Sequence, residues 1–587
     1  MCGIVGYAGG RKAAEIIYEG LLRLEYRGYD SAGIAVLKDG KISAVKRQGR
    51  VCALGGYIKD MDGKLGIGHT RWATHGSPSD INAHPHSAGK FTIVHNGIIE
   101  NYSQLKAEYF DGEKFTSETD SEVVVRLLDK FYDGDITRAL FKVASLLNGS
   151  YAVAAVCTDF DGVAVIKNKS PVIIGYGNDG NFIASDAPAL AGFCGEISFL
   201  KDGDCALVTR GGVSIFDSAM QGVLRERVKN SATNASLDLN GCPHYMLKEI
   251  REVPASVVNT CNAYSSAEEK LKSVVSGCDR VIIVGCGTAY NSGLIAKRYI
   301  EKFARIPAEA EIAGEFRYNK PVVTPTTAVI AVSQSGETAD TLEAAKLAYS
   351  LGAKVVAVTN APYSQLTRCA HAVVPVVAGH EICVAATKSY TGQIAALYLI
   401  AHTLAGRDIG EATQKLFKIS RLCETAIETE GTDSLAHMCA RSVGTYFLGR
   451  DLDYAVAVEG SLKLREISYI AGGGYPAGEL KHGTLALVDE NVVAVVIITD
   501  KRLADKSMNA VEQVLARGGK VAVISNIAET EKELQGRAQL IKIPDCDENL
   551  SPLVSAVAVQ LLAYKTAVLL NRDPDKPRNL AKSVTVE

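Results

Sequence analysis

The sequence predicts a multidomain protein of mixed α/β and α+β class. Its expected order is an antiparallel-sheet domain, two doubly wound parallel-sheet domains and a short C-terminal tail. A chain of 587 residues is too long for one core, and roughly 150 residues per domain gives about four lobes. Short β-like runs separated by glycine fill the first part, whereas buried strand, glycine turn and long helix alternate in the rest. This second pattern occurs twice.

The N-terminal domain is expected at residues 2–225, followed by a linker at 226–241 that is polar and weakly periodic. Apolar runs rich in β-branched residues indicate strands, and a 3.6-residue apolar period indicates helices that cover the sheets. The predicted strands are 3–7, 33–37, 41–47, 91–95, 152–157 and 163–167, and the predicted helices are 13–24, 121–132 and 136–147.

Two parallel-sheet domains are expected at 242–425 and 426–572, with the tail at 573–587. The strand VIIVG at 281–285 leads into a helix reaching residue 303, and AVIAVS at 328–333 leads into a helix ending at residue 351. AGEF at 313–316 recurs as AGEL 164 residues later, and GAKVVAVTN recurs as GGKVAVISN 166 residues later. One such match could be chance, but two in nearly the same register favour a duplication.

Composition excludes several classes of protein. The 63 basic and 66 acidic residues leave a net charge of −3, so no nucleic acid or anionic membrane partner is expected. The 14 cysteines form neither a CxxC knuckle nor a disulfide framework, which fits a reducing cytoplasm. The longest apolar stretch, 553–570, is interrupted by Ser555, Gln560 and Lys565, and no signal peptide is visible, so we expect a soluble protein.

Cys2 is the first candidate catalytic residue. Removal of Met1 would leave a thiol and a free α-amine on one residue, and an amine with a pKa of about 8 can take the thiol proton, as in N-terminal nucleophiles. A cysteine at this position is more often incidental, so the assignment depends on its neighbours in the sequence.

Four blocks accompany it: YRGYDS with Arg27 and Gly28, HTRWATHG at 69–76, HNGIIEN at 95–101 and SETDSE at 117–122. An arginine suits a substrate carboxylate, an aspartate suits an α-ammonium, and Asn-Gly offers a side-chain amide and a backbone N–H as an oxyanion hole. Each block alone could be a turn or a surface ion pair.

Together with CGIVG, these blocks resemble the glutaminase domain of the class II (N-terminal nucleophile) glutamine amidotransferases. The resemblance implies a four-layer αββα fold, Cys2 as nucleophile, and Asn96 with Gly97 as oxyanion hole. It implies that Arg71 and Asp120 hold the two ends of glutamine. The whole glutamine-binding set is then Arg27, Arg71, Trp72, Thr74, His75 and Asp120.

No metal or other cofactor is expected. Histidines stand at positions 69, 84, 86 and 95, but no carboxylate or cysteine lies at ligand spacing from them.

SQSGET at 333–338 lies where a buried strand ends and a helix begins, so its hydroxyls and backbone N–H groups can surround a phosphate. The alternative is an ordinary helix cap. CGTAYNSG at 286–293 forms a second small-residue loop at the same sheet edge, which favours phosphate. It is neither a Walker loop nor a dinucleotide fingerprint.

EGSLKLRE places Glu459, Lys463 and Glu466 on one helix face. The alternative is a solvated salt-bridge face, but the apolar flanks favour a buried helix whose charges face a cavity. His482 and Lys582 add an acid/base group and an amine nucleophile. A lysine with a phosphate cradle suggests imine chemistry on a sugar carbonyl.

These blocks resemble the paired sugar isomerase (SIS) domains of a family of isomerising aminotransferases that use L-glutamine and fructose 6-phosphate. That resemblance implies Lys582 as the Schiff-base lysine, His482 in ring opening and Glu466, with Lys463 nearby, in proton transfer between C1 and C2. It also implies a homodimer through the SIS domains, in which His482 reaches the neighbouring site, and Trp72 as a gate for ammonia. The implied sugar-phosphate residues are Thr288, Ser333, Gln334, Ser335, Thr338, Val384 and Ala581.

Two departures and two alternatives remain. Ala289 and Ala386 stand where the family pattern has serine, which removes two possible phosphate donors. Amidophosphoribosyltransferases and asparagine synthetases share the glutaminase start, but neither of their nucleotide or pyrophosphate loops is visible. A phosphosugar sensor would not need Glu466, His482 and Lys582.

Overall fold

The computed structural model describes residues 2–230, 232 and 238–585. Their contacts divide the chain into two compact units. The first contains Met1–Asp238 and Ala581–Glu587, and the second contains Leu239–Leu580. Part of the predicted linker, residues 231 and 233–237, lies outside the described residues. Its beginning forms strand β14 (Arg227–Lys229) at the edge of a sheet.

The first unit contains two antiparallel sheets, as the glycine-separated β-like runs predicted. The first sheet has the order β14-β11-β9-β10-β1-β4-β2-β3, and the second has the order β13-β12-β8-β7-β6-β5. In the first sheet the bounds, besides β14, are β11 Glu196–Phe199, β9 Ile173–Gly177, β10 Gly180–Ala184, β1 Gly3–Gly9, β4 Leu65–Arg71, β2 Ser31–Lys38 and β3 Lys41–Gln48. In the second they are β13 Gly212–Phe216, β12 Cys205–Thr209, β8 Phe160–Asn168, β7 Gly149–Cys157, β6 Phe91–Ile99 and β5 His86–Ala88.

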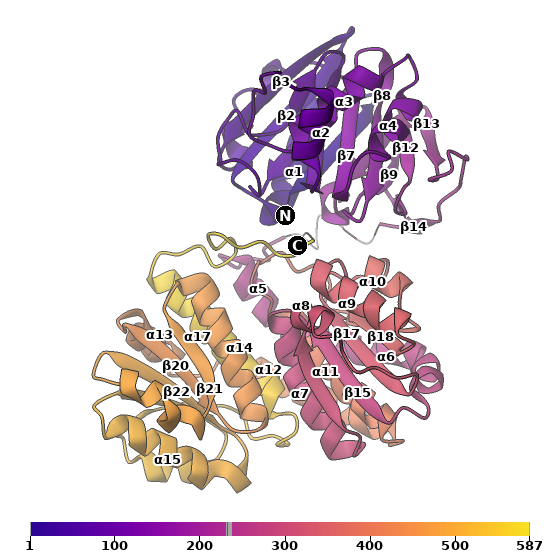
Figure 1. Cartoon of the computed structure of the whole chain (residues 1–587). Helices are drawn as coiled ribbons and strands as arrows, with labels where there is room; N and C mark the ends of the chain where they lie inside the picture. Colours follow the sequence, from indigo (N-terminus) through magenta and orange to yellow (C-terminus); the bar gives the residue numbers. More distant parts are fainter. Residues whose placement is uncertain (1, 231, 233–237, 586–587) are drawn as a thin grey trace. The chain divides into compact units, whose positions relative to one another are not determined.

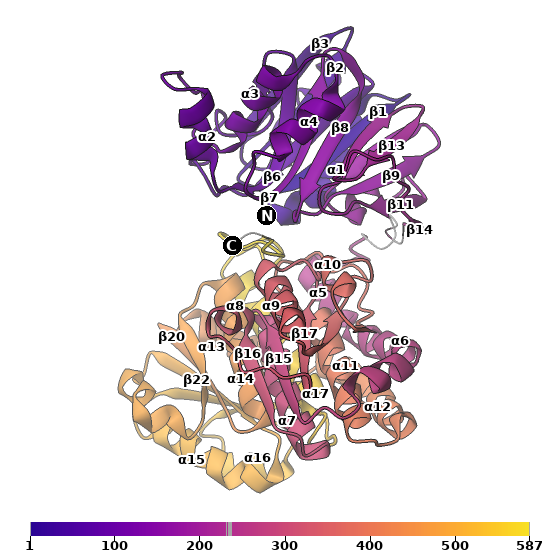
Figure 2. The ribbon, with the colours of Figure 1, turned by 45° about the vertical axis from the view of Figure 1, so that its right-hand side comes forward.

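Helices cover the outer face of each sheet in this unit, which gives the layers α, β, β and α (Figures 1 and 2). One core lies between the sheets and joins Ile4 of β1 to Val94 of β6, and another lies between the second sheet and its helices. The helices are α1 Ala13–Leu24 on the first sheet, and α2 Tyr102–Tyr109, α3 Ser121–Phe131 and α4 Ile136–Ala144 on the side of the second. The predicted strands and helices of this region are confirmed.

The second unit contains two parallel sheets with the same strand order, drawn in magenta and orange in Figure 1. The orders β16-β15-β17-β18-β19 and β21-β20-β22-β23-β24 correspond strand by strand, so the predicted duplication is confirmed in the fold. The first sheet comprises β15 Arg280–Gly285, β16 Ala308–Ile312, β17 Thr327–Ser333, β18 Lys354–Thr359 and β19 Ala372–Pro375. The second comprises β20 Gly444–Gly449, β21 Gly472–Pro476, β22 Val492–Ile498, β23 Lys520–Ser525 and β24 Gln539–Lys542.

Helices lie on both faces of each parallel sheet, because parallel strands need covered crossovers. A shared core joins the inner faces of both sheets, and a separate core covers each outer face. The helices are α5 Tyr245–Arg251, α6 Val253–Val275, α7 Thr288–Phe303, α8 Ala313–Tyr318, α9 Ala339–Ser350, α10 Gln365–Arg368, α11 Lys388–Leu404, α12 Ile409–Ile427, α13 Thr432–Ala440, α14 Leu452–Ser468, α15 Ala504–Leu515, α16 Ala528–Leu534 and α17 Ser551–Leu569.

Helix α17 is long and apolar enough to cross a membrane by length and composition, with a mean hydropathy of 1.5. However, 83% of the apolar window is buried inside the protein, where it packs against α14 and α13 in the shared core. This burial is typical of a core helix.

Candidate functional site

Cys2 lies directly before β1, and backbone and side-chain groups from distant strands hold it. The Trp72 N–H donates to Cys2 Sγ at 3.3 Å, and the thiol approaches the Trp72 carbonyl oxygen at 3.5 Å. The Cys2 carbonyl accepts from Asn96 Nδ2 at 3.1 Å and from Arg27 Nε at 3.4 Å. Burial raises the pKa of the thiol, so a base is needed to generate the thiolate nucleophile.

Two buried charged side chains act on this thiol electrostatically and could hold an amino acid. Arg71, at the end of β4, donates through Nη2 to the carbonyls of His75 and Gly76. Its buried Nη1 has no hydrogen-bond partner among the described residues. Asp120 accepts from the Ile99 N–H at 2.8 Å. A buried guanidinium with an unused donor suits a substrate carboxylate, and a buried aspartate suits an ammonium group.

The rest of the HTRWATHG block, residues 72–76, follows Arg71 directly. The Trp72 ring meets Tyr29 edge-on, with ring centroids 6.0 Å apart. Thr74 Oγ1 lies 3.5 Å from His75 Nδ1, and the His75 ring packs on Tyr102 at 5.4 Å. Trp72 thus lies beside Cys2, while Thr74 and His75 contact each other and His75 contacts Tyr102.

Gly97 and Arg27 have clear structural reasons for their identity. Gly97 has a φ of +123°, and a Cβ there would lie 1.8 Å from the Ser150 carbonyl oxygen, so only glycine fits. Arg27, which we expected among the glutamine-binding residues, forms a 2.7 Å ion pair with Asp186 and donates to Cys2. Its observed contacts thus position the nucleophile.

Sequence reasoning missed several residues that support Cys2. Ser185, directly after β10, accepts from the Ile4 N–H and from Asn96 Nδ2, both at 2.8 Å. Asp186 also accepts from the Tyr26 hydroxyl at 2.7 Å. No local motif marks these side chains, because strand pairing between distant segments brings them together.

Four histidines, at positions 69, 84, 86 and 95, form a buried cluster in this unit. The rings of His69 and His84 lie 4.2 Å apart, and Ser121 Oγ bridges His84 Nε2 and His95 Nδ1 at 2.9 and 2.8 Å. Burial lowers the pKa of all four, to about 3 for His69 and His86. Within the described residues, no group of three or more His, Cys, Asp or Glu side chains is arranged to hold a metal ion.

The cluster predicts a loss of stability in acid. Below pH ~6.5 the unfolded chain binds protons that the folded histidines do not bind, so stability falls as the pH is lowered. For His69 and His86 the loss continues towards pH ~3, at about 1.4 kcal/mol per pH unit for each. Emission of Trp72, the one tryptophan in the sequence, reports unfolding of this unit. The urea midpoint should decrease between pH 7.5 and pH 5, and less so in His86→Gln. An equal pH dependence in the variant would contradict this assignment.

In the second unit, the SQSGET turn forms the predicted hydroxyl cradle at the end of β17. Ser333 Oγ accepts from the Gly336 N–H at 3.0 Å and lies 3.1 Å from Thr338 Oγ1, while Ser335 Oγ accepts from the Glu337 N–H at 3.2 Å. Thr338 is the N-cap of α9, but in the described chain its side chain makes no cap hydrogen bond. An ordinary N-cap therefore does not account for the Thr338 hydroxyl, while Ser333 and Ser335 accept from backbone N–H groups of the turn.

The duplicated sheet lacks this cradle. The corresponding turn after β22 begins at Ile498 and has Asp500 where the first has Ser335. Asp500 accepts from the Arg502 N–H, and Asp453 accepts from Thr499. Two carboxylates at this turn would repel a phosphate, whereas the turn of the first sheet presents hydroxyls and directs its one carboxylate, Glu337, to Gln365.

The three charges of α14 are mostly buried, so the alternative of a solvated salt-bridge face is wrong. Glu459 is 0% exposed, Lys463 1% and Glu466 21%. Glu459 accepts from Asn291 Nδ2 at 2.7 Å and from Thr288 Oγ1 at 3.0 Å. Lys463 Nζ contacts Thr288 Oγ1 at 2.9 Å and Glu466 at 2.7 Å. Thr288, which begins α7, thus connects the loop at 286–293 to the charged face.

Lys463 is held in its charged form. Burial alone would lower its pKa, but Glu459 and Glu466 outweigh burial and raise it. An ammonium group that stays protonated serves as an electrostatic and hydrogen-bonding partner. Glu466, at the partly exposed end of this network, is the group best placed to exchange a proton with a substrate.

Removal of this buried cation should destabilise the second unit. Lys463→Met leaves Glu459 buried beside two neutral donors, and loss of one partner of a buried pair costs about 3–5 kcal/mol. Lys297→Met, in the partly exposed i, i+4 pair with Glu301, is the matched control and should cost less than ~1 kcal/mol. Calorimetric unfolding of both variants checks the difference. Equal losses would contradict the burial argument.

The remaining residues that were predicted for the sugar-phosphate reaction come from several separate segments of the chain. The Val384 N–H donates to the Asp575 carbonyl at 3.0 Å, and the Gln334 carbonyl accepts from the Asn360 N–H at 3.2 Å. His482 is exposed in the short helix Glu479–His482. Ala581 and Lys582 lie in the segment that groups with the first unit, and each is partly buried there.

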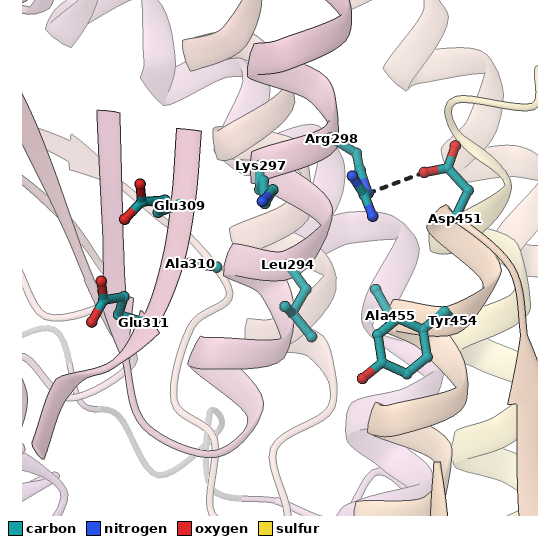
Figure 3. Close-up of a pocket in the computed structure, with 9 residues that line it drawn as sticks. All are labelled: Leu294, Lys297, Arg298, Glu309, Ala310, Glu311, Asp451, Tyr454 and Ala455. Atoms are coloured by element: carbon teal, nitrogen blue, oxygen red, sulfur yellow. Dashed lines mark ion pairs between the residues drawn. The ribbon is translucent and has the colours of Figure 1, made fainter. Parts of the chain in front are cut away.

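A separate hollow of about 300 Å³ lies between α7, β16 and the start of α14 (Figure 3). Arg298 and Asp451 form a 3.1 Å ion pair across it, and Glu309 and Glu311 line it from the edge strand. None of the predicted site residues lines this hollow.

Comparison with known proteins matches both units. The SIS domain family matches residues 275–403 and 440–570, and the glutamine amidotransferase domain family matches residues 69–192. The glutamine–fructose-6-phosphate aminotransferase [isomerizing] of Clostridium acetobutylicum is 43% identical over the full length of both chains. That of Thermus thermophilus is 44% identical, also over both full lengths.

This chain belongs to the isomerising glutamine–fructose-6-phosphate aminotransferase family. Among solved structures, the C-terminal domain of glucosamine-fructose-6-phosphate aminotransferase from Francisella tularensis is 36% identical, with a TM-score of 0.54, over 57% of this chain and 99% of that domain. The tagatose-6-phosphate ketose/aldose isomerase of Escherichia coli, 15% identical with a TM-score of 0.51, shares the fold over 57% of this chain and 95% of its own.

Proposed function

We propose that this protein converts L-glutamine and fructose 6-phosphate into L-glutamate and glucosamine 6-phosphate. The supporting observation is that one chain carries both reaction centres. A cysteine beside oxyanion donors lies in the first unit, and a hydroxyl cradle with a buried Lys–Glu network lies in the second. Full-length similarity to the isomerising aminotransferases adds to this support.

The first unit hydrolyses the amide of glutamine. The free α-amine that removal of Met1 leaves on Cys2 takes the thiol proton, and the thiolate attacks the amide carbon. The Gly97 N–H stabilises the oxyanion that forms, together with Asn96 Nδ2, which turns one hydrogen from the Cys2 carbonyl to the oxyanion. The α-ammonium group gives this proton to the amide nitrogen as the C–N bond breaks, so the nitrogen leaves as ammonia, and water then hydrolyses the thioester to glutamate and the free thiol. The Arg71 Nη1 donor binds the substrate carboxylate and Asp120 binds its ammonium group. Trp72, Thr74 and His75 close over the substrate.

The second unit uses the ammonia. The residues proposed to bind its phosphate are Thr288, Ser333, Gln334, Ser335, Thr338, Val384 and Ala581. Because five of these have a hydroxyl or amide side chain, we propose that Ala289 and Ala386 leave phosphate binding intact.

His482 assists ring opening, and the Lys582 amine then forms an imine at C2 of the open sugar, where a C=N bond replaces the C=O bond and water leaves. Ammonia displaces the lysine, and Glu466 then moves a proton from C1 to C2, which gives the aldose with an amino group at C2. Lys463 keeps Glu466 oriented and balances its charge.

Several further features are part of this proposal. The domains are a glutaminase domain at 2–225, to which β14 adds an edge strand, a linker in the rest of 226–241, SIS domains at 242–425 and 426–572, and an active-site tail at 573–587. The protein acts in the cytoplasm as a homodimer through its SIS domains. Ammonia passes between the centres without mixing with the solvent, and Trp72 controls its passage.

Product analysis tests the proposed function. Purified protein with both substrates should form glutamate and glucosamine 6-phosphate in a 1:1 ratio, and omission of glutamine should abolish the amino sugar. Formation of glutamate alone, with no amino sugar at any fructose 6-phosphate concentration, would reject the second half of the reaction.

A further inference from the structure

His69 is a buried residue that the proposed reaction leaves unused. It lies in β4 of the first sheet, 0% exposed, and its ring reaches β6 of the second sheet. Its Nε2 lies 2.9 Å from the His95 carbonyl oxygen and 3.1 Å from Asn96 Oδ1. Its Nδ1 has no hydrogen-bond partner among the described residues.

These contacts fix the tautomer of His69. A backbone carbonyl only accepts hydrogen bonds, so Nε2 must carry the hydrogen and donate it. The same N–H is shared with Asn96 Oδ1. The low pKa of His69, about 3 through burial, agrees with a neutral ring that has its hydrogen on Nε2 alone.

The tautomer in turn fixes the Asn96 amide. With its oxygen towards His69, Asn96 directs Nδ2 to the Cys2 carbonyl at 3.1 Å and to Ser185 Oγ at 2.8 Å. A flipped amide would place its NH₂ group against the His69 N–H and its oxygen against the Cys2 carbonyl. Both contacts would then be repulsive, so hydrogen bonding selects one of the two orientations.

We propose that His69 is a positioning residue for glutamine hydrolysis, which holds the Asn96 amide with its NH₂ group towards Cys2. This inference depends on the glutaminase activity proposed above. Oxyanion donors are effective when they are oriented before the reaction, and removal of one costs about 10²- to 10³-fold in kcat. The His69 ring forms hydrogen bonds with the His95 carbonyl and with Asn96, and with none of the residues proposed to bind glutamine. We therefore expect His69 to affect catalysis through Asn96.

Two kinds of substitution separate donation from packing. His69→Gln places an amide N–H near the position of Nε2 but removes the ring, whereas His69→Phe keeps a ring but removes the donor. His69→Leu also removes the donor and adds no bulk. It provides the same test if the Phe variant does not fold. A role in packing on His84 predicts that Phe is tolerated better than Gln, and the proposal predicts the reverse order.

The variants are compared by their kcat and KM for glutamine hydrolysis and by their affinity for two ligands, an aldehyde analogue of glutamine and the product glutamate. We expect kcat for glutamine hydrolysis to fall about 10²-fold in the Phe and Leu variants, with KM changed less than ~3-fold, and to stay within ~5-fold of wild type in the Gln variant. The γ-aldehyde analogue of glutamine accepts the Cys2 thiolate at its carbonyl carbon. A C–S bond forms and the C=O π bond breaks, which leaves an oxyanion that takes a proton from water.

Affinity for this aldehyde should fall by the same factor as kcat in the Phe and Leu variants, whereas affinity for the product glutamate should stay within ~3-fold of wild type. A parallel loss of glutamate binding, full activity of Phe or Leu, or a Gln variant weaker than Phe would overturn the proposal. Absence of glutamine hydrolysis in the wild-type protein would instead reject the proposed function, so the two failures are distinguishable.

Discussion

Cys2→Ala should abolish glutamine hydrolysis, with a fall of at least ~10⁴-fold in the rate of glutamate formation. The sulfur is the atom that attacks the amide, and removal of a nucleophile leaves only the contributions of binding and the oxyanion hole. Binding of fructose 6-phosphate, measured by calorimetric titration, should be unchanged, because the hydroxyl cradle lies in the other compact unit.

Cys52→Ala is the matched control. Cys52 is an exposed free cysteine in the same unit, so its replacement should leave both measurements at the wild-type level. If Cys2→Ala also lost sugar-phosphate binding, Cys2 would have a structural role. If it retained glutamine hydrolysis, another nucleophile would have to be sought.

Glu466→Gln should lower the formation of glucosamine 6-phosphate by about 10²- to 10⁴-fold, the usual contribution of a positioned acid or base. Glutamine keeps the size of the side chain and an acceptor for Lys463 Nζ, now at 2.7 Å from the carboxylate, but it cannot carry the proton between C1 and C2. Exchange of the C1 hydrogen with D₂O, followed by NMR, should be lost with the product.

The duplication supplies a control at the equivalent place. Lys302 lies on α7 where Glu466 lies on α14, three residues after Tyr299 as Glu466 is three after Lys463. It contacts Glu548 and Asn549, away from the hydroxyl cradle of the first sheet. Lys302→Gln should therefore leave product formation unchanged. If Glu466→Gln exchanged its C1 hydrogen at the wild-type rate, another group would have to move the proton.

Much of the fold could be predicted because its signals are local. Apolar runs and glycine turns marked the strands of both units, and the two recurring segments, 164 and 166 residues apart, correspond to equivalent positions after β16 and β21 and in β18 and β23. The apolar flanks of EGSLKLRE correctly indicated that Glu459 and Lys463 are buried.

The residues that support Cys2 and Asn96 were harder to predict from the sequence. Ser185, Asp186 and His69 act on Cys2 or Asn96 through contacts that only strand pairing creates, such as Ile4 with His69 across β1 and β4. The observed pairing of Arg27 with Asp186 also depends on a residue 159 positions away. Single motifs identify groups that meet the substrate, but not the groups that orient them.

Isotope transfer tests the central claim most directly. The protein is given glutamine labelled with ¹⁵N in its side-chain amide, fructose 6-phosphate, and a large excess of unlabelled ammonium. We predict glucosamine 6-phosphate that carries ¹⁵N in nearly every molecule, because the nitrogen does not mix with the solvent between the two centres. Product with unlabelled nitrogen in proportion to the added ammonium would contradict the account.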